Sequence, residues 1–160
     1  MSGRRLFEDF TPGETFHSGG LTVTETHIVS WASLTGDWTW LHTDAEKAAH
    51  SVFGERVAHG PFTFAAALGL VTQTGMLGNG IIAWLGADEL RLPAPVRFGD
   101  TITVYCTVLG CRPSRKGDRG TVELGYEVRT QHDEPVMTFR SSFLIRRVDA
   151  RDDAAPAAIR

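Results

Sequence analysis

The segment that decides the fold is "HGPFTFAAALGLVTQTG", residues 59–75. Gly60 stands at a cap position, and Pro61 suits the first helical position because its missing N–H would have no partner there. Residues 62–71 then carry one polar side chain, Thr63. A helix that is apolar on all its faces has to be covered on most sides by other structure. The sequence therefore predicts a long helix at the centre of the fold.

Segments with strand patterns follow this helix. Residues 101–109, 121–130 and 136–145 alternate between apolar and polar side chains, and residues 80–96 form another extended run. Such alternation is typical of half-buried antiparallel strands. The expected inward side chains are Ile102, Val104, Cys106, Val108, Val122, Leu124, Tyr126, Val128, Met137, Phe139, Phe143 and Ile145. About four meandering strands and one buried helix predict an α+β fold, in which a curved antiparallel sheet wraps the long central helix.

The chain of 160 residues, 42% hydrophobic and 22% charged, is the size of one domain. We expect that domain over residues 1–149, followed by a disordered tail over 150–160 that is poor in hydrophobic residues. A net charge of −3 leaves no basic stripe for a nucleic-acid partner. The densest basic patch is interrupted by proline, glycine and aspartate, and indicates a solvated hairpin tip, with an anionic ligand as the alternative; it comprises Arg112, Arg115, Lys116 and Arg119.

The cysteines and the apolar runs bear on localisation. Cys106 and Cys111 do not form a disulfide scaffold or a zinc motif, so we expect free thiols in a reducing compartment. The N-terminus lacks the apolar run of a signal peptide, and the longest such run, residues 64–71, is too short to cross a bilayer. The expectation is a cytoplasmic protein without a membrane partner.

The candidate chemistry lies in "LTGDWTWLHTD", residues 34–44. The preceding pattern predicts a short helix capped by Thr26 and stopped by Gly36 in the left-handed conformation. Asp37 and His42 are five residues apart, so their side chains converge only in an irregular loop. A carboxylate and an imidazole sharing one water suit general acid–base catalysis. The alternative is that Asp37 caps a turn and that His42 is a satisfied core histidine.

Other residues of this region have expected supporting roles. Trp38, Trp40 and Leu41 would exclude bulk water from the pair and lower the local dielectric. Asp44 would orient the loop or cap a short helical turn after it. His59 would stabilise the turn before the central helix.

The start of the central helix offers backbone donors. The first N–H groups of a helix have no intrahelical acceptor, and this end is positively polarised. Gly60 could thus hold a thioester oxygen that gains negative charge. The alternative is that Gly60 only permits close packing.

The sequence resembles the MaoC-like, (R)-specific enoyl-CoA hydratase family. The resemblance is carried by "SLTGDWTWLHTDAEKAAHSVFGERVAHGPF" and "LRLPAPVRFGDTITV", and it covers roughly residues 8–148. It implies the hotdog fold and reversible addition of water to a trans-2-enoyl thioester, giving an (R)-3-hydroxyacyl thioester. By this resemblance Asp37 and His42 are the catalytic pair, and Gly60 supplies the N–H for the thioester oxygen. It also implies a homodimer with no metal or redox cofactor, and CoA or a carrier protein as the acyl carrier.

Two residues depart from the family, which usually has Asn and Pro where this chain has Thr39 and Trp40. We therefore expect a reshaped pocket that takes a branched, dicarboxylic or carrier-bound acyl group. The pocket residues expected are Trp38, Thr39, Trp40, Leu41, His59, Pro61 and Phe62. Arg97, before the "FGD" turn, is expected either to meet a CoA phosphate or to be solvated.

Two other functions remain open. A hotdog thioesterase usually has a catalytic carboxylate on or beside the central helix, and residues 60–75 contain no Asp or Glu. The altered Thr39–Trp40 pair leaves open a non-catalytic module that binds acyl thioesters.

Overall fold

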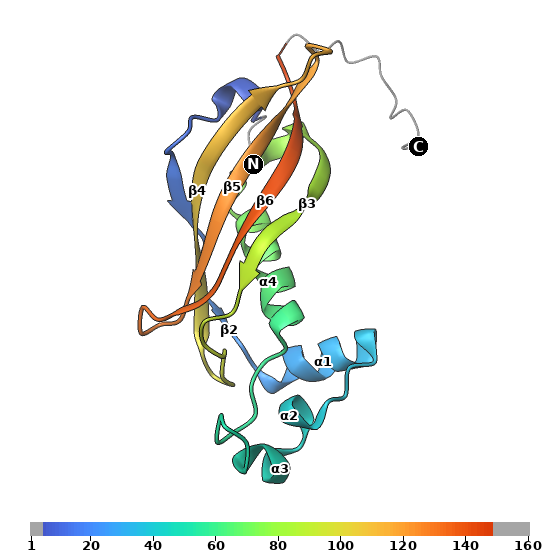
Figure 1. Cartoon of the computed structure of the whole chain (residues 1–160), viewed down its shortest axis with the longest axis vertical. Coiled ribbons are helices and arrows are strands. Elements are labelled where there is room, and N and C mark those ends of the chain that lie inside the picture. Colours follow the sequence, from blue (N-terminus) through green and yellow to red (C-terminus); the bar gives the residue numbers. More distant parts are fainter. Residues whose placement is uncertain (1–4, 149–160) are drawn as a thin grey trace.

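The computed structural model describes residues 5–148, so the predicted tail over 150–160 lies outside the described residues. A curved sheet runs along the helix α4, and three short helices, α1 to α3, lie beyond the N-terminal end of α4 (Figure 1). The predicted antiparallel α+β architecture, with a sheet wrapped on a central helix, is confirmed. The chain contains no described helix of the length and apolarity needed to cross a membrane.

The elements follow the chain in this order. The helices are the 3₁₀ turn η1 (Phe7–Asp9), α1 (Glu25–Thr35), α2 (Trp40–Thr43), α3 (Ala45–Ala49), α4 (Gly60–Gln73) and the 3₁₀ turn η2 (Gly78–Gly80). The strands are β1 (Thr15–His17), β2 (Leu21–Thr22), β3 (Ile81–Arg91), β4 (Thr101–Pro113), β5 (Arg119–Arg129) and β6 (Pro135–Arg146).

The order of the strands corrects the predicted meander. The sheet runs β1-β4-β5-β6-β3, with β2 also paired to β4, and every pair is antiparallel. Only β4, β5 and β6 form a meander, because β3 crosses to the far edge and pairs with β6. The strands β1 and β2 were not predicted, since two or three residues are too few to show an alternating pattern.

The core lies between α4 and the inner face of the sheet. All twelve inward side chains predicted on β4, β5 and β6 are buried, so the strand patterns are confirmed. The helix α4 buries Phe62, Thr63, Ala67, Leu70 and Val71. Its opposite side is exposed at Ala65 and Gly69, so this chain alone covers only part of the apolar helix.

The helix boundaries differ slightly from the prediction. The helix α1 is capped by Thr24 rather than Thr26, and the Thr24 N–H donates to Nδ1 of His27 at 3.0 Å. Gly36 ends it in the left-handed conformation, with φ of 78° as predicted. At α4 the cap is His59, so Gly60 is already the first helical residue.

The cysteines and the basic patch behave as the sequence indicates. Both cysteines are free, and burial raises the pKa of the Cys106 thiol to about 12, which keeps it protonated and unreactive at neutral pH. The basic patch lies at the turn between β4 and β5, where Arg119 pairs with Asp118. The predicted hairpin tip is therefore confirmed.

Candidate active site

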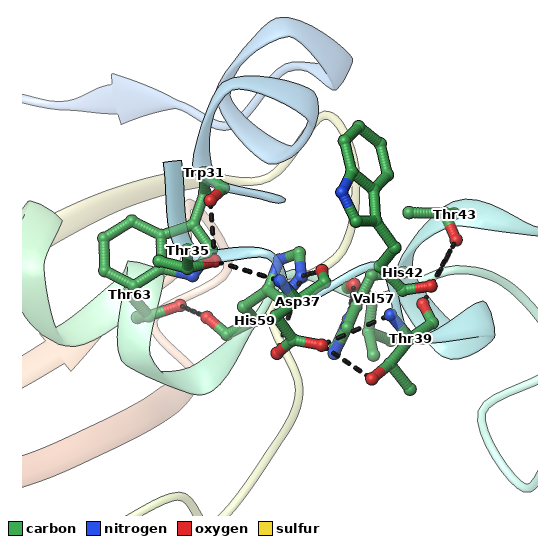
Figure 2. Close-up of polar contacts among 10 residues, drawn as sticks. Trp31, Thr35, Asp37, Thr39, His42, Thr43, Val57, His59 and Thr63 are labelled. Carbon is green, nitrogen blue, oxygen red and sulfur yellow. Dashed lines mark hydrogen bonds and ion pairs between the residues drawn. The ribbon is translucent and has the colours of Figure 1, made fainter. Parts of the chain in front are cut away.

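The structure brings Asp37 and His42 together, as predicted. Asp37 lies in the loop of residues 36–39 that Gly36 opens, and His42 lies on the short helix α2. A carboxylate oxygen of Asp37 and ring nitrogens of His42 and His59 all lie within 4.8 Å of one another. Figure 2 shows the three side chains meeting beside the start of α4. One water can bridge two such atoms, because each hydrogen bond spans about 2.8 Å.

Thr39 fixes the carboxylate of Asp37. The Thr39 hydroxyl donates to Asp37 Oδ1 at 2.6 Å, and the Thr39 backbone N–H donates to the same oxygen at 3.2 Å. The Thr39 hydroxyl, and next its N–H, hold the pKa of Asp37 below its usual value. Desolvation opposes this lowering, and its effect is larger than the further lowering by either His59 or His42. Asp37 is therefore an ionised proton acceptor at neutral pH.

The backbone sets the tautomer of His42. Its Nδ1 lies 2.7 Å from the carbonyl oxygen of Val57. A carbonyl only accepts, so Nδ1 carries the proton, and the neutral ring keeps its lone pair on Nε2. The role of Val57 was missed in the sequence, because it is fifteen residues from His42 and an apolar side chain gives no signal of what its carbonyl does.

His59 contacts both members of the pair. Its side chain is fully buried at the N-cap of α4, and its ring stacks on His42 with centroids 3.8 Å apart. Its Nε2–H donates to the backbone oxygen of Asp37 at 3.0 Å. Burial lowers the pKa of His59, so it is neutral, and its 3.9 Å approach to Asp37 Oδ2 is not an ion pair. His59 was predicted to stabilise a turn. It also contacts both Asp37 and His42, so its supporting role includes positioning the pair.

Because His59 is buried in its neutral form, the free energy of unfolding should depend on pH. The unfolded chain binds a proton at this residue below a pH of about 6.5, whereas the folded chain binds it only at lower pH. The free energy of unfolding should therefore fall as the pH drops below about 6.5, down to the folded pKa. Urea denaturation at fixed protein concentration across this range measures it. His59→Gln should flatten the dependence, and His50→Gln, at an exposed site, should not. Equal slopes in wild type and His59→Gln would contradict the prediction.

The start of α4 lies beside the pair. The first intrahelical bond there runs from the Thr63 N–H to the His59 carbonyl, so the Gly60 N–H precedes the hydrogen-bonded ladder. An added Cβ at Gly60 would lie 2.7 Å from Cδ2 of Leu92. Leu92 was missed as a site residue, because nothing local in its sequence indicates that it packs against residue 60.

The predicted shield of tryptophans is wrong for the single chain. Trp38 is 54% exposed and Trp40 is 38% exposed, while Leu41 is half-buried. The Trp40 ring packs under the Lys47 ammonium at 4.9 Å instead of over the acid–base pair. A cavity of about 360 Å³ lies elsewhere, on the sheet face that points away from α4, and shares no residue with this site. Within one chain, bulk water therefore reaches Asp37.

The remaining predicted residues are partly placed at the site. Phe62 is buried against the rings of His27 and Trp31, so it belongs to the core, and Pro61 is exposed. Asp44 accepts the Lys47 N–H at 3.0 Å and caps α3 as predicted. Arg97 is engaged by Glu55 at 2.7 Å and does not extend freely toward a phosphate.

The three convergent groups resemble a metal ligand set in composition only. Asp37, His42 and His59 would supply one carboxylate oxygen and two ring nitrogens. Imidazole lone pairs lie in the ring plane, and these two rings are stacked at an interplanar angle of 30°. Stacked rings direct their lone pairs side by side rather than toward one ion about 2 Å from each. The arrangement therefore suits proton transfer better than metal binding.

Comparison with known proteins places this chain in a family. The family profile described as "MaoC like domain" matches residues 9–131. Protein MaoC of Klebsiella aerogenes is 43% identical over 104 residues, which are 65% of this chain and 30% of that protein. The (R)-specific enoyl-CoA hydratase of Rhodospirillum rubrum is 36% identical over 110 residues, 69% of this chain and 74% of that protein. This chain thus matches less than a third of the Klebsiella relative and most of the Rhodospirillum one.

Solved structures agree on the fold. A protein from Archaeoglobus described as a monoamine oxidase regulatory protein has a TM-score of 0.87 at 35% identity, covering 92% of this chain and 99% of that one. A Mycobacterium tuberculosis protein described as having a double hotdog fold has a TM-score of 0.80 at 22% identity, covering 98% of this chain and 47% of that one. The second likeness concerns the fold alone and confirms the predicted hotdog architecture.

Proposed function

The chain belongs to the MaoC-like dehydratase family, and from that premise we propose that it adds water reversibly to a trans-2-enoyl thioester. The product is a 3-hydroxyacyl thioester, with the (R) configuration that the family resemblance implies. The observation that supports this most is the convergence of Asp37 and His42 within 4.8 Å of one another, close enough to share one water. The direction in which the reaction runs depends on which thioester is supplied.

The proposed steps use the protonation states of the pair. Asp37 is ionised, and the tautomer of His42 that the Val57 carbonyl selects has its lone pair on Nε2, so both can accept a hydrogen bond from one water. As the water oxygen bonds to C3 of the enoyl group, the pair takes one proton from the water. The pair then passes one proton to C2 on the same face, and returns to its starting protonation state.

The helix start is proposed to stabilise the charge that develops on the thioester oxygen. Electrons move from the C2–C3 double bond toward the carbonyl as the oxygen of water adds at C3. The Gly60 N–H, at the positively polarised end of α4, would donate to that oxygen. The reaction so described needs no metal or redox cofactor, and the acyl carrier is CoA or a carrier protein.

An assay with crotonyl-CoA tests this function. Hydration removes the absorbance of the conjugated thioester and releases no thiol, whereas a thioesterase releases free CoA. Loss of absorbance without thiol release supports the proposal. Thiol release would instead support a thioesterase, and binding without either signal, measured by calorimetry, would support a non-catalytic module. The same assay should be run with branched and dicarboxylic enoyl-CoA, because Thr39 and Trp40 are expected to reshape the pocket.

We also propose that the protein acts as a homodimer that pairs through β3. This strand of eleven residues lies at the sheet edge and exposes Ile82, Trp84, Leu85 and Leu90. A long apolar edge is an aggregation hazard unless it is covered. Light scattering should give a dimer mass, and Leu85→Lys should shift it toward the monomer. Leu109→Lys, at a similarly exposed leucine on β4, should not. A monomeric wild type, or a dimer unaffected by Leu85→Lys, would contradict the proposal.

A further inference from the structure

The Thr39 hydroxyl points toward Asp37. This contact gives Thr39 a role beyond the one first expected of it, which was to line the substrate pocket. Its hydroxyl and its backbone N–H both bind Asp37 Oδ1, at 2.6 and 3.2 Å. The first distance is typical of a charge-assisted bond from a hydroxyl to a carboxylate. With Oδ1 occupied twice, Oδ2 is the oxygen left toward the histidines, 3.9 Å from His59 Nε2. Figure 2 shows the carboxylate between Thr39 and His59.

The same residue also starts the helix that carries His42. Thr39 is the N-cap of α2, and its carbonyl accepts the His42 N–H at 3.0 Å and the Thr43 hydroxyl at 3.2 Å. The Thr39 side chain makes no capping bond to α2, so its hydroxyl is committed to Asp37. Backbone and side chain of one residue thereby fix the positions of both Asp37 and His42.

We infer that Thr39 is a positioning residue for the proposed hydration, and that its hydroxyl holds the Asp37 carboxylate in the rotamer that leaves Oδ2 free for the water. The expected effect on kcat rests on the proposed function. The hydrogen bond from Thr39 to Asp37 does not, because it can be tested without substrate.

The groups around Asp37 determine how its pKa changes when the Thr39 hydroxyl is removed. The titratable groups that face Asp37 are His42 from α2 and His59 from the start of α4. Among the causes that lower the pKa of Asp37, the hydroxyl of Thr39 is the largest, ahead of its N–H and both histidines. Losing the hydroxyl should therefore raise the pKa of Asp37 and free the carboxylate to rotate.

The test compares Thr39→Val, which keeps the branched shape without the hydroxyl, with Thr39→Ser, which keeps the hydroxyl. The first readout is a ¹³C NMR titration of the Asp37 carboxyl in the full chain without substrate. Thr39→Val should move this titration to higher pH, and Thr39→Ser should leave it close to wild type. Thr39 is exposed, so both variants should fold, which circular dichroism checks.

The second readout is the pH profile of crotonyl-CoA hydration. Thr39→Val should lower kcat about tenfold, less than the roughly 10²- to 10⁴-fold lost when an acid or base is removed outright, because the carboxylate is displaced but still present. KM should change little, and the acid limb of the profile should move to higher pH. Thr39→Ser should restore both. An unshifted Asp37 titration in Thr39→Val, or equal losses in the two variants, would overturn the inference. If wild type hydrates no thioester, the proposed function fails, while the titration still decides whether Thr39 positions Asp37.

Discussion

Asp37→Asn and His42→Ala are each expected to lower kcat for enoyl-thioester hydration by about 10²- to 10⁴-fold, the range lost with a positioned acid or base. Asparagine keeps the shape of Asp37 and still accepts the Thr39 hydroxyl, but it cannot take a proton from water at neutral pH. The Val57 carbonyl selects the tautomer of His42 that has a lone pair on Nε2, and alanine at position 42 removes this proton acceptor. Initial rates with crotonyl-CoA measure both effects.

The two losses should not add. If Asp37 and His42 act on one water, removing either disables the same step, so the double variant should be about as slow as the slower single variant. His50→Ala is the control, because His50 is exposed and its ring Nδ1 bonds the Glu46 carbonyl of its own helix. The free energy of unfolding of every variant should lie within about 1 kcal/mol of the wild-type value, since Asp37 and His42 are not in the core. A near-normal kcat in either single variant, or a variant that unfolds, would show that the pair is structural.

Gly60→Ala should produce the second large loss, about 10- to 100-fold in kcat/KM. The added Cβ would lie 2.7 Å from Leu92 Cδ2, where carbon atoms normally keep about 3.5–4.0 Å. The contacting atom is the terminal methyl of Leu92, which is 50% exposed and can rotate away from part of the clash. The part that the helix start takes up instead displaces the proposed donor, and a displacement of about 1 Å beside reacting groups can cost about a hundredfold. The backbone N–H of residue 60 is still present in this variant. The loss of activity therefore measures how well this N–H is positioned and how easily the substrate reaches it.

Two further variants isolate this cause. Gly69→Ala lies on the same helix, and its Cβ would meet nothing within 4 Å. It should leave activity unchanged and raise stability by about 0.5–1 kcal/mol, because alanine suits a helix interior better than glycine. Leu92→Ala should restore much of the activity when combined with Gly60→Ala, because it removes the contact. No rescue, or an equal loss in Gly69→Ala, would show that the Gly60 variant acts through the helix in general.

Local sequence determined the parts of the fold that depend on near neighbours. Gly36 ends α1 because a left-handed residue is needed there, and Asp44 caps α3 through an N–H three residues ahead. The alternation along β4, β5 and β6 gave the buried face correctly, because successive side chains of a strand point to opposite sides. The choice of Asp37 and His42 as the pair came from the spacing around Gly36 and from the family resemblance.

The tertiary structure alone decided the relations between distant segments. It placed β3 beside β6, put the Val57 carbonyl on His42, stacked His59 on the same ring and set Leu92 against Gly60. It also left Trp38 and Trp40 exposed, against expectation. The physical reason is range: turn and strand patterns follow from backbone sterics over a few residues. Partners across the chain follow instead from which surfaces remain to be covered after all the elements have packed.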